Sequence, residues 1–459
     1  MKNWKLNFKN WEYTVSIFIG LYFILINFVF EFSEVENLKN HLRVVPNEVI
    51  QHFNVDISSN NNFAYIQYST NYQYLNLALI NCITLRKSET IAKSLVVLFD
   101  KNLEFEDIAK FNRLRDISAQ YDITLKPVEV LAVSKSSSTD WAKSFTKFHV
   151  FNQDEFDRII YFDSDSMFVN VDMADSNTGD LLRNLPGNFD ELFKLPNEFD
   201  LILPHAYWLT KEEHKRSKKV EVPNEKRYNL KIGKLISDIE NNGDKNIWQF
   251  LPSLFSEDQK FKNRDHFFAN HVMVLSPSKE TFKQIKKYIY NPLLWLLTNR
   301  SKLRKVSDFD MEIMNRFIDD KFKQHSDFKV GILPHKNYGV LTGEFREFWH
   351  ARFIAEPQYL PYSKRKTNDN WYPLKTLSKI RSVHFSDAPI PKPWEFEDNY
   401  DHYNIFKIYC FDSSFNEEEY KRSYPSEWKP RLTDDCASVQ IWNWIREEFS
   451  KTMQLYWVV

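Results

Sequence analysis

Two aspartates that directly follow an apolar run have the clearest chemical meaning in this sequence. In the stretch DRIIYFDSDSMFVN, Asp163 and Asp165 stand one residue apart after the apolar run Arg158–Phe162. Two carboxylates at that place repel each other and do not help a strand to form, so we expect a partner to offset their charge. As hard oxygen ligands they can bind Mn²⁺ or another divalent cation such as Mg²⁺, which then bridges a diphosphate. In that case the pair is electrostatically strained until the cation binds.

Two other interpretations of the aspartate pair remain. The pair could be the nucleophile and general acid of a phosphatase of the haloacid dehalogenase type. However, Met167 stands where that signature has Thr or Val, and three strand–helix units precede the motif. The pair could also cap backbone N–H groups in a turn, which accounts for one aspartate more easily than for two. We favour the metal–diphosphate interpretation over the turn, and the turn over the phosphatase.

A cation held by two carboxylates needs a further ligand, and an imidazole suits Mn²⁺. In VHFSDAPIPKPW, His384 follows a β-branched residue at the end of a predicted strand, and Lys392 comes eight positions later in a Pro-Lys-Pro-Trp frame. A histidine after a strand is more often structural than ligating, but this lysine suits a phosphate contact. We therefore predict that His384 binds the metal and that Lys392 binds the diphosphate.

Alternating strands and helices would bring these groups to one edge of a sheet. The apolar runs predict strands at Phe63–Ser69, Ser94–Phe99, Ile123–Leu131 and Arg158–Phe162, with helices at Tyr72–Lys87, at Glu104–Tyr121 and in DWAKSFTKFHVFN. HVMVLSP, VGILP and RSVHFSD predict further strands. This order predicts an α/β fold with parallel βαβ units in a doubly wound sheet. Ligands of such sheets bind at the carboxyl ends of the strands, where the aspartates lie.

The first residues predict a membrane anchor. The uncharged run Tyr13–Phe30 follows three lysines and precedes three glutamates, and no small-residue cleavage site follows it. We therefore expect a cytoplasmic tail at residues 1–12, a transmembrane helix in the lipid bilayer at 13–30, and a lumenal remainder. A polar stem is expected at 31–62 and a globular domain at 63–459.

Composition narrows the possible partners of the chain. The net charge is −1, with 61 basic and 62 acidic residues, so no overall field attracts nucleic acid, and we expect no such partner. There are 8 glycines and no Gly-rich phosphate motif. A charged segment near residues 210–248 is interpreted as a solvated insertion. The cysteines Cys82, Cys410 and Cys436 have no metal-binding spacing, and whether the last two are bonded stays open.

The motifs of the chain resemble those of the glycogenin-like glycosyltransferases (family 8) from about Phe63 to Trp394. Members of that family are retaining enzymes of GT-A fold, a Rossmann-like nucleotide-sugar fold, that use UDP-sugars and Mn²⁺. Within the family the chain looks most like the fungal Golgi N-acetylglucosaminyltransferases. FDRIIYFDSDSMF resembles the element YDRVIYLDSD, which implies that Asp163 and Asp165 bind the metal. VHFSDAPIPKPW resembles HFLG…KPW, which implies the same for His384 and a diphosphate contact for Lys392.

The resemblance implies donor contacts for further residues. FTKFHVF places Lys147 at the donor, FFANHVMVLSPSKETF places Asn270 near the sugar, and FDMEIMN places Asp310 at the sugar hydroxyls. Thr70 and Asn71, at the end of the first strand, are expected to meet the uridine.

The implied activity is transfer of N-acetylglucosamine from UDP-GlcNAc, with retention, to mannose residues of mannan or N-glycans by a single-pass type II Golgi membrane protein. The chain departs from the family pattern near the sugar pocket, where His271 replaces a small residue and Met311 replaces a glutamine. One alternative is therefore a transferase of another UDP-sugar, glucose or galactose. The other is a lumenal lectin-like or scaffold protein that keeps the fold without catalysis.

Overall fold

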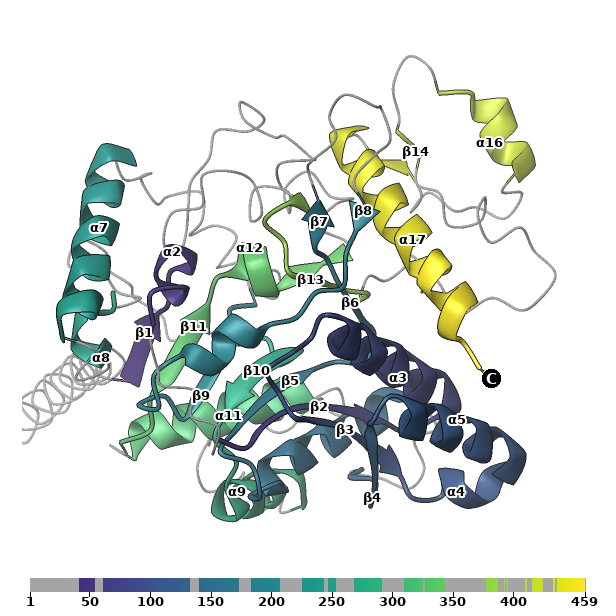
Figure 1. Ribbon diagram of the computed structural model, residues 1–459, viewed down its shortest axis with the longest axis horizontal. Coiled ribbons are helices and arrows are strands. Elements are labelled where there is room, and N and C mark those ends of the chain that lie inside the picture. The colour runs from purple at the N-terminus through teal and green to yellow at the C-terminus, as the bar shows by residue number, and fades with distance from the viewer. Residues whose placement is uncertain are drawn as a thin grey trace, which may run out of the picture.

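The structure is a computed structural model (Figure 1). It describes residues 41–53, 61–132, 140–172, 183–206, 225–242, 247–252, 268–290, 309–324, 327–342, 377–386, 392, 394, 409–410, 415–423, 432–433 and 436–458. The predicted cytoplasmic tail and membrane anchor lie outside these ranges, as does Asn299 of the sequon NRS. Within the ranges, none of the helices combines the length and the apolar character that crossing a bilayer requires.

A central sheet of eight strands, in the order β1-β11-β9-β10-β5-β2-β3-β4, forms the middle of the fold. Its strands are β1 (Leu42–Val44), β2 (Phe63–Ser69), β3 (Ser94–Asp100), β4 (Thr124–Val128), β5 (Arg158–Phe162), β9 (Leu201–Pro204), β10 (Val272–Leu275) and β11 (Val330–Leu333). All neighbours are parallel except β10, which is antiparallel to both β5 and β9. The predicted α/β fold with a mostly parallel sheet is therefore confirmed.

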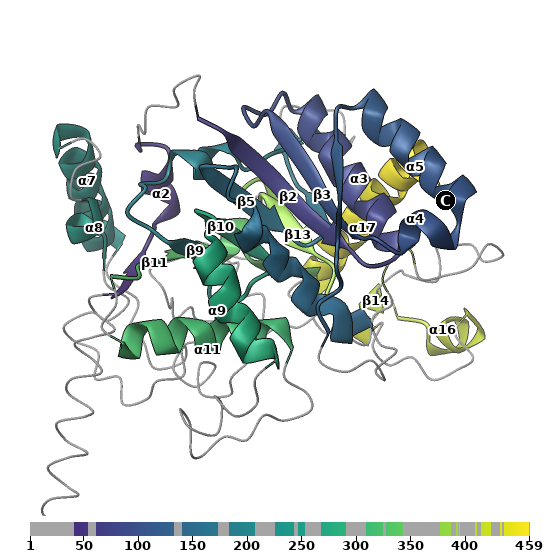
Figure 2. The ribbon, with the colours of Figure 1, turned by 90° about the horizontal axis from the view of Figure 1, so that it is seen from below.

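Helices cover both faces of this sheet, as Figure 2 shows. One face carries α3 (Tyr72–Lys87) and α5 (Ile108–Gln120), and the other carries the 3₁₀ helix η1 (Asp140–Asn152), α9 (Lys279–Tyr290) and α11 (Asp310–Lys323). Alternate strand residues face opposite layers: on β3, Val97 packs in the first core and Val96 in the second. Both faces of the sheet are therefore apolar and buried under helices.

Most predicted elements form where the apolar patterns place them. Helix α3 and strand β5 have the predicted bounds. The helix predicted at Glu104–Tyr121 is divided into α4 (Leu103–Glu106) and α5. The break occurs because Asp107 leaves the helical conformation and caps α5, accepting a hydrogen bond from the backbone N–H of Lys110 at 3.0 Å.

Two predicted segments need correction. Residues 42–50, assigned to the stem, form β1 and α2 (Asn47–Ile50), and β1 is the edge strand beside β11. The predicted charged insertion contains α7 (Glu225–Asn242), which is not fully solvated because Leu235 and Ile239 are buried in the same core as Val49 of α2. An amphipathic helix keeps its charged face in water while its apolar stripe packs, so the charge run concealed a packed element.

A smaller sheet joins a strand from the first half of the chain to two strands from the second half. It pairs β12 (Val340–Leu341), β13 (Ser382–His384) and β6 (Ser166–Phe168), with β13 antiparallel to β6 and His384 opposite Ser166. The long C-terminal helix α17 (Cys436–Tyr456) packs in the core beside this sheet. The remaining elements are β7 (Val171–Asp172), β8 (Arg183–Asn184), η2 (Asp190–Lys194), α8 (Ile247–Phe250), α12 (His335–Tyr338), β14 (Tyr409–Cys410), α16 (Glu417–Ser423) and β15 (Leu432–Thr433).

Candidate metal and donor site

The two aspartates lie in a short turn between β5 and β6. The turn is held from three sides by hydrogen bonds to its backbone or to its serine. The backbone N–H of Asp163 donates to the carbonyl of His271 at 2.9 Å, Ser164 Oγ donates to the carbonyl of Tyr68 at 2.6 Å, and Asn81 Nδ2 donates to the carbonyl of Ser164 at 3.0 Å. The backbone of the turn is therefore held by groups other than its two carboxylates.

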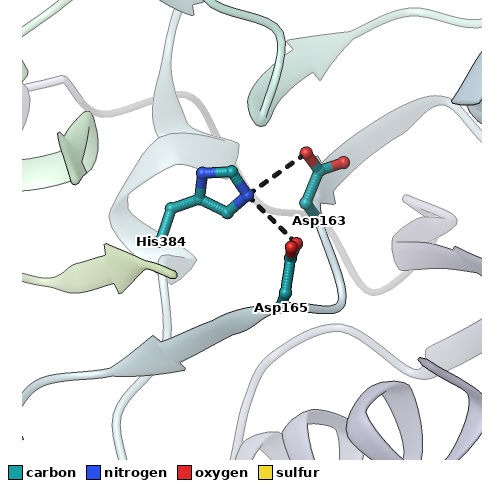
Figure 3. Close-up of side chains that lie close together, drawn as sticks. All are labelled: Asp163, Asp165 and His384. Atoms are coloured by element: carbon teal, nitrogen blue, oxygen red, sulfur yellow. Dashed lines mark hydrogen bonds and ion pairs between the residues drawn. The ribbon is translucent and has the colours of Figure 1, made fainter. Parts of the chain in front are cut away.

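His384 meets both aspartates across the smaller sheet, as Figure 3 shows. Its Nε2 lies 3.0 Å from Asp165 Oδ1 and 3.6 Å from Asp163 Oδ2. Within the described residues, these three side chains form a group whose ligand atoms all lie within 4.8 Å of one another. Two carboxylate oxygens and one imidazole nitrogen aimed at one point fit Mn²⁺ or a similar divalent cation. The three predicted metal ligands are thus brought together.

Lys147 connects one aspartate to two of the predicted sugar contacts. Its buried ammonium lies 3.1 Å from Asp163 Oδ1, 2.7 Å from Asp310 Oδ2 and 3.4 Å from Asn270 Oδ1. The three residues come from η1, from the start of α11 and from the segment before β10, so the fold gathers distant parts of the chain here. Lys147, Asp310 and Asn270 therefore lie beside the metal group, and their donor contacts stay a prediction.

Lys392 balances the second aspartate. Its ammonium forms an ion pair with Asp165 and donates to Tyr74 Oη at 3.0 Å. The aromatic rings of Tyr74 and Trp394 each lie 5.4 Å from the same nitrogen. Lysines on both sides thus offset the repulsion between the carboxylates without any cation. The expectation that only a metal offsets this repulsion is wrong, although the pKa of Asp163 stays raised by burial and by Asp165.

The surroundings move the pKa values of the two aspartates in opposite directions. Burial alone would raise the pKa of Asp165, but the ammonium of Lys392 and the contact with His384 outweigh it and hold this pKa well below its usual range. Burial raises the pKa of Asp163, and Lys147 and His384 oppose it only in part. Opposed shifts in one buried cluster are typical of functional sites, although structural ion-pair networks also produce them.

The predicted uridine contacts lie where β2 passes into α3. Thr70 is buried at the end of β2, and Asn71 caps α3 by accepting a hydrogen bond from the backbone N–H of Tyr74 at 2.9 Å. This cap commits one oxygen of Asn71 to the helix. The same helix turn brings Tyr74 to Lys392, so the predicted uridine contacts and the metal group lie at neighbouring places.

Sequence reasoning missed two tyrosines of the site. Tyr161 Oη donates a hydrogen bond to Asp163, and Tyr74 Oη accepts one from Lys392. A tyrosine two residues before an aspartate in a buried strand points to the same side of the sheet as that aspartate, and this spacing could have indicated Tyr161. No comparable local signal indicates Tyr74, because its partner is 318 residues away.

The C-terminal helix α17 packs against residues next to His384 and Lys392. Phe449 of α17 contacts the rings of Phe385 and Trp394, at centroid distances of 4.9 and 5.5 Å. Phe385 directly follows His384, and Trp394 lies two positions after Lys392. A single buried ring, 55 positions after Trp394, therefore packs against neighbours of both residues.

Phe449→Ala tests this support. We expect both Phe449→Ala and the control Phe111→Ala to lower the free energy of unfolding by about 3 kcal/mol, because both rings are buried. Only Phe449→Ala should also weaken Mn²⁺ and UDP binding, by about tenfold, since Phe111 packs on Phe99, away from these residues. Titration calorimetry and thermal unfolding measure the two effects. Equal ligand affinities in the two variants would show that α17 does not hold the site.

Comparison with known proteins gives the relationship of the chain. No protein-family model matches it. It is 49% identical to glucose N-acetyltransferase 1 of Candida albicans, over 99% of this chain and 98% of that protein. It is 47% identical to glucose N-acetyltransferase 1 of Debaryomyces hansenii, over 98% of this chain and 97% of that protein. Among solved structures, the galactosyltransferase LgtC in complex with donor and acceptor sugar analogues has a TM-score of 0.40 at 10% identity, over 86% of this chain and 97% of that chain.

Nearly half of the residues are thus shared with two relatives over almost their whole length. The relationship to the fungal branch, which the motifs around Asp163 and His384 indicated, is confirmed. The chain belongs to the glucose N-acetyltransferase 1 family, which is that fungal branch of glycosyltransferases.

Proposed function

We propose that this glycosyltransferase transfers N-acetylglucosamine from UDP-GlcNAc, with retention, to mannose-containing glycans of glycoproteins. One observation carries the proposal: a metal-type group of two aspartates and a histidine lies between two lysines, Lys147 and Lys392. This combination of a divalent-cation site and nearby ammonium groups suits a diphosphate donor. The relatives' name refers to an N-acetyl group and to glucose, which supports an N-acetylated glucose in the donor.

The residues of the site divide the work as follows. Asp163, Asp165 and His384 would hold the cation, which when bound offsets the charge that develops on the departing UDP. The side chain of Lys392 is about one fifth exposed, so its ammonium can turn from Asp165 toward a phosphate oxygen. Such charge-assisted contacts are short and strong.

The sugar end of the site has a different character. Asp310 and Asn270 are buried and share Lys147, so we assign them to the sugar hydroxyls. The carboxylate of Asp310 is 2.7 Å from the ammonium of Lys147, which makes it a poor covalent nucleophile. The retained configuration then requires attack from the face that UDP leaves, with a diphosphate oxygen accepting the proton of the acceptor.

A screen of UDP-sugars tests the proposal. The full-length protein with Mn²⁺ should release UDP from UDP-GlcNAc faster than from UDP-glucose or UDP-galactose, and should label a mannan or N-glycan acceptor. Chelation of the metal should stop the release. A protein that binds Mn²⁺ but releases UDP from none of the donors would be the lectin-like alternative, and preferred turnover of another UDP-sugar would correct the donor.

We also propose that the enzyme is a single-pass type II Golgi membrane protein, anchored by residues 13–30. The proposal is supported by the uncharged run with basic residues before it and acidic residues after it. In sealed microsomes the chain should resist protease except at its N-terminal tail, and endoglycosidase should shift it if Asn299 carries a glycan. Loss of the globular part to external protease would contradict this topology.

A further inference from the structure

His271 contacts His384 and Asp163 of the candidate metal group but is not one of its ligands. Its ring is stacked nearly parallel to that of His384, with centroids 4.9 Å apart and planes inclined by 5°. Its backbone carbonyl accepts the hydrogen bond from the N–H of Asp163 at 2.9 Å. Among the described residues it is not part of the group whose ligand atoms lie within 4.8 Å of one another. His271 therefore packs against the candidate ligands and is not itself one of them.

The Nδ1 nitrogen of His384, the one that faces away from the aspartates, makes with the described residues none of the contacts that usually orient a metal-binding histidine. A metal-binding histidine usually donates its other ring N–H to a carboxylate, carbonyl or water, which fixes the ring. The Nδ1 of His384 is buried and has no hydrogen-bond partner in the part of the chain that the structure describes. Figure 3 shows that this nitrogen points away from the two aspartates. Among the described residues the ring is thus held by the hydrogen bond between Nε2 and Asp165 and by stacking on His271, with no hydrogen bond at Nδ1.

We propose that His271 is a positioning residue that holds the imidazole of His384 with Nε2 toward Asp163 and Asp165. This inference rests on the proposed function, because it concerns the metal site of that function. A tilt of the His384 ring out of its present plane would carry Nε2 away from the carboxylates and would also break the stacking. Stacked aromatic rings attract each other beyond the effect of their burial, so the stacking opposes such a tilt. This role would explain why the chain has a histidine at position 271, where the family pattern has a small residue.

The competing interpretation is that His271 only fills the core, since it is 5% exposed. Two substitutions distinguish the interpretations. His271→Phe keeps a flat ring of similar size for stacking, while His271→Leu keeps an apolar side chain of similar volume without a ring. A filler predicts that both variants behave alike, whereas a stacking partner predicts that only the leucine variant loses control of His384.

The experiment is a double-mutant cycle on Mn²⁺ affinity, measured by titration calorimetry on the full-length protein. We expect His271→Phe to bind Mn²⁺ within about threefold of the parent, and His271→Leu to bind it about tenfold more weakly. In a His384→Ala background, His271→Leu should cause no further weakening, because it acts through His384. The nitrogen coupling to Mn²⁺ in pulsed electron paramagnetic resonance should persist in the phenylalanine variant and diminish in the leucine variant.

The outcomes separate this inference from the proposed function. A parent protein that does not bind Mn²⁺ overturns both. If the parent and the phenylalanine variant bind Mn²⁺ and the leucine variant binds it equally well, His271 has no positioning role. Additive losses in the cycle would overturn the proposal as well, since they would show that His271 acts independently of His384. If the leucine variant does not fold, a phenylalanine variant with tenfold weaker binding and an unchanged thermal midpoint is sufficient to refute it.

Discussion

Asp165→Asn is expected to lower UDP-GlcNAc turnover by about a thousandfold or more. The substitution removes one of two carboxylates from the candidate metal group while nearly keeping the shape of the side chain. A cation that stabilises a leaving diphosphate contributes several kcal/mol, and each 1.36 kcal/mol is about tenfold in rate. Mn²⁺ binding and metal-dependent UDP binding should be lost together with turnover. Retained transfer would refute the role that we assign to the aspartate pair.

The same variant should also be less stable without metal, because Lys392 loses its charged partner. Asp165 forms an ion pair with Lys392 and lies 3.0 Å from His384 Nε2 in a nearly buried position. Breaking a buried pair leaves an uncompensated charge, but Lys392 is about one fifth exposed and can reach water, so we expect a loss of about 1–3 kcal/mol. The control Asp154→Asn, which breaks an exposed pair with Lys279, should cost less than about 1 kcal/mol.

The combined result separates the three interpretations of the pair. A turn would keep activity, because Asn replaces Asp well in turns. A phosphatase would lose hydrolysis of simple phosphate esters and would not act on a UDP-sugar. Activity and thermal midpoint, each measured with and without Mn²⁺, therefore decide among metal site, turn and phosphatase in one variant.

The part of the site that depends on local patterns could be predicted from the sequence. Asp163 and Asp165 follow a five-residue apolar strand, and the carboxyl end of a parallel strand is a strong positional signal. His384 lies 219 residues from Asp165 in the chain, and their meeting depends on the pairing of β13 with β6. Neither periodicity nor spacing encodes that pairing, so the strand end and the nearby Lys392 could indicate His384 as a ligand but could not place it beside Asp165.

What could not be predicted depends on contacts between distant segments. Strand β1 has only three residues, so it is too short to show a periodic pattern, and it pairs with β11, more than 280 positions away. Phe449 is one of 39 phenylalanines, and nothing in its neighbourhood indicates that it packs behind His384. The compensation of Asp165 by Lys392 was missed for the same reason, which is why the metal-free pair was expected to be strained.

Lys147→Met should destabilise the fold more than either Asp165→Asn or Phe449→Ala. Lys147 is 3% exposed and pairs with Asp163 and Asp310, which are themselves nearly buried. Methionine fills similar space without the charge, so two carboxylates lose their shared cation. Removing one partner of a buried ion pair typically costs about 3–5 kcal/mol. The exposed pair of Lys126 with Glu155 at 2.7 Å offers a matched control, since Lys126→Met should cost less than about 1 kcal/mol.

The pH dependence identifies the cause of that loss. In the parent protein, burial would raise the pKa of Asp310, but Lys147 outweighs it and holds this pKa below the usual 3.8. Asp310 therefore stabilises the fold above about pH 4, and this contribution is lost as the pH falls through its folded pKa. Without Lys147, the main opposition to burial is lost, so the folded pKa of Asp310 rises and that of Asp163, already raised in the parent, rises further. Their contribution then becomes unfavourable as the pH rises through that folded pKa.

The difference in stability between the parent and Lys147→Met should accordingly be largest near pH 8 and become smaller toward pH 4. Denaturant unfolding at several pH values measures it, with Lys126→Met expected to show a small difference at every pH. A large loss that does not change with pH would mean that Lys147 acts by filling space. A loss that grows with pH means that two buried carboxylates depend on this lysine, and the arrangement of Asp163 for metal binding then depends on it too.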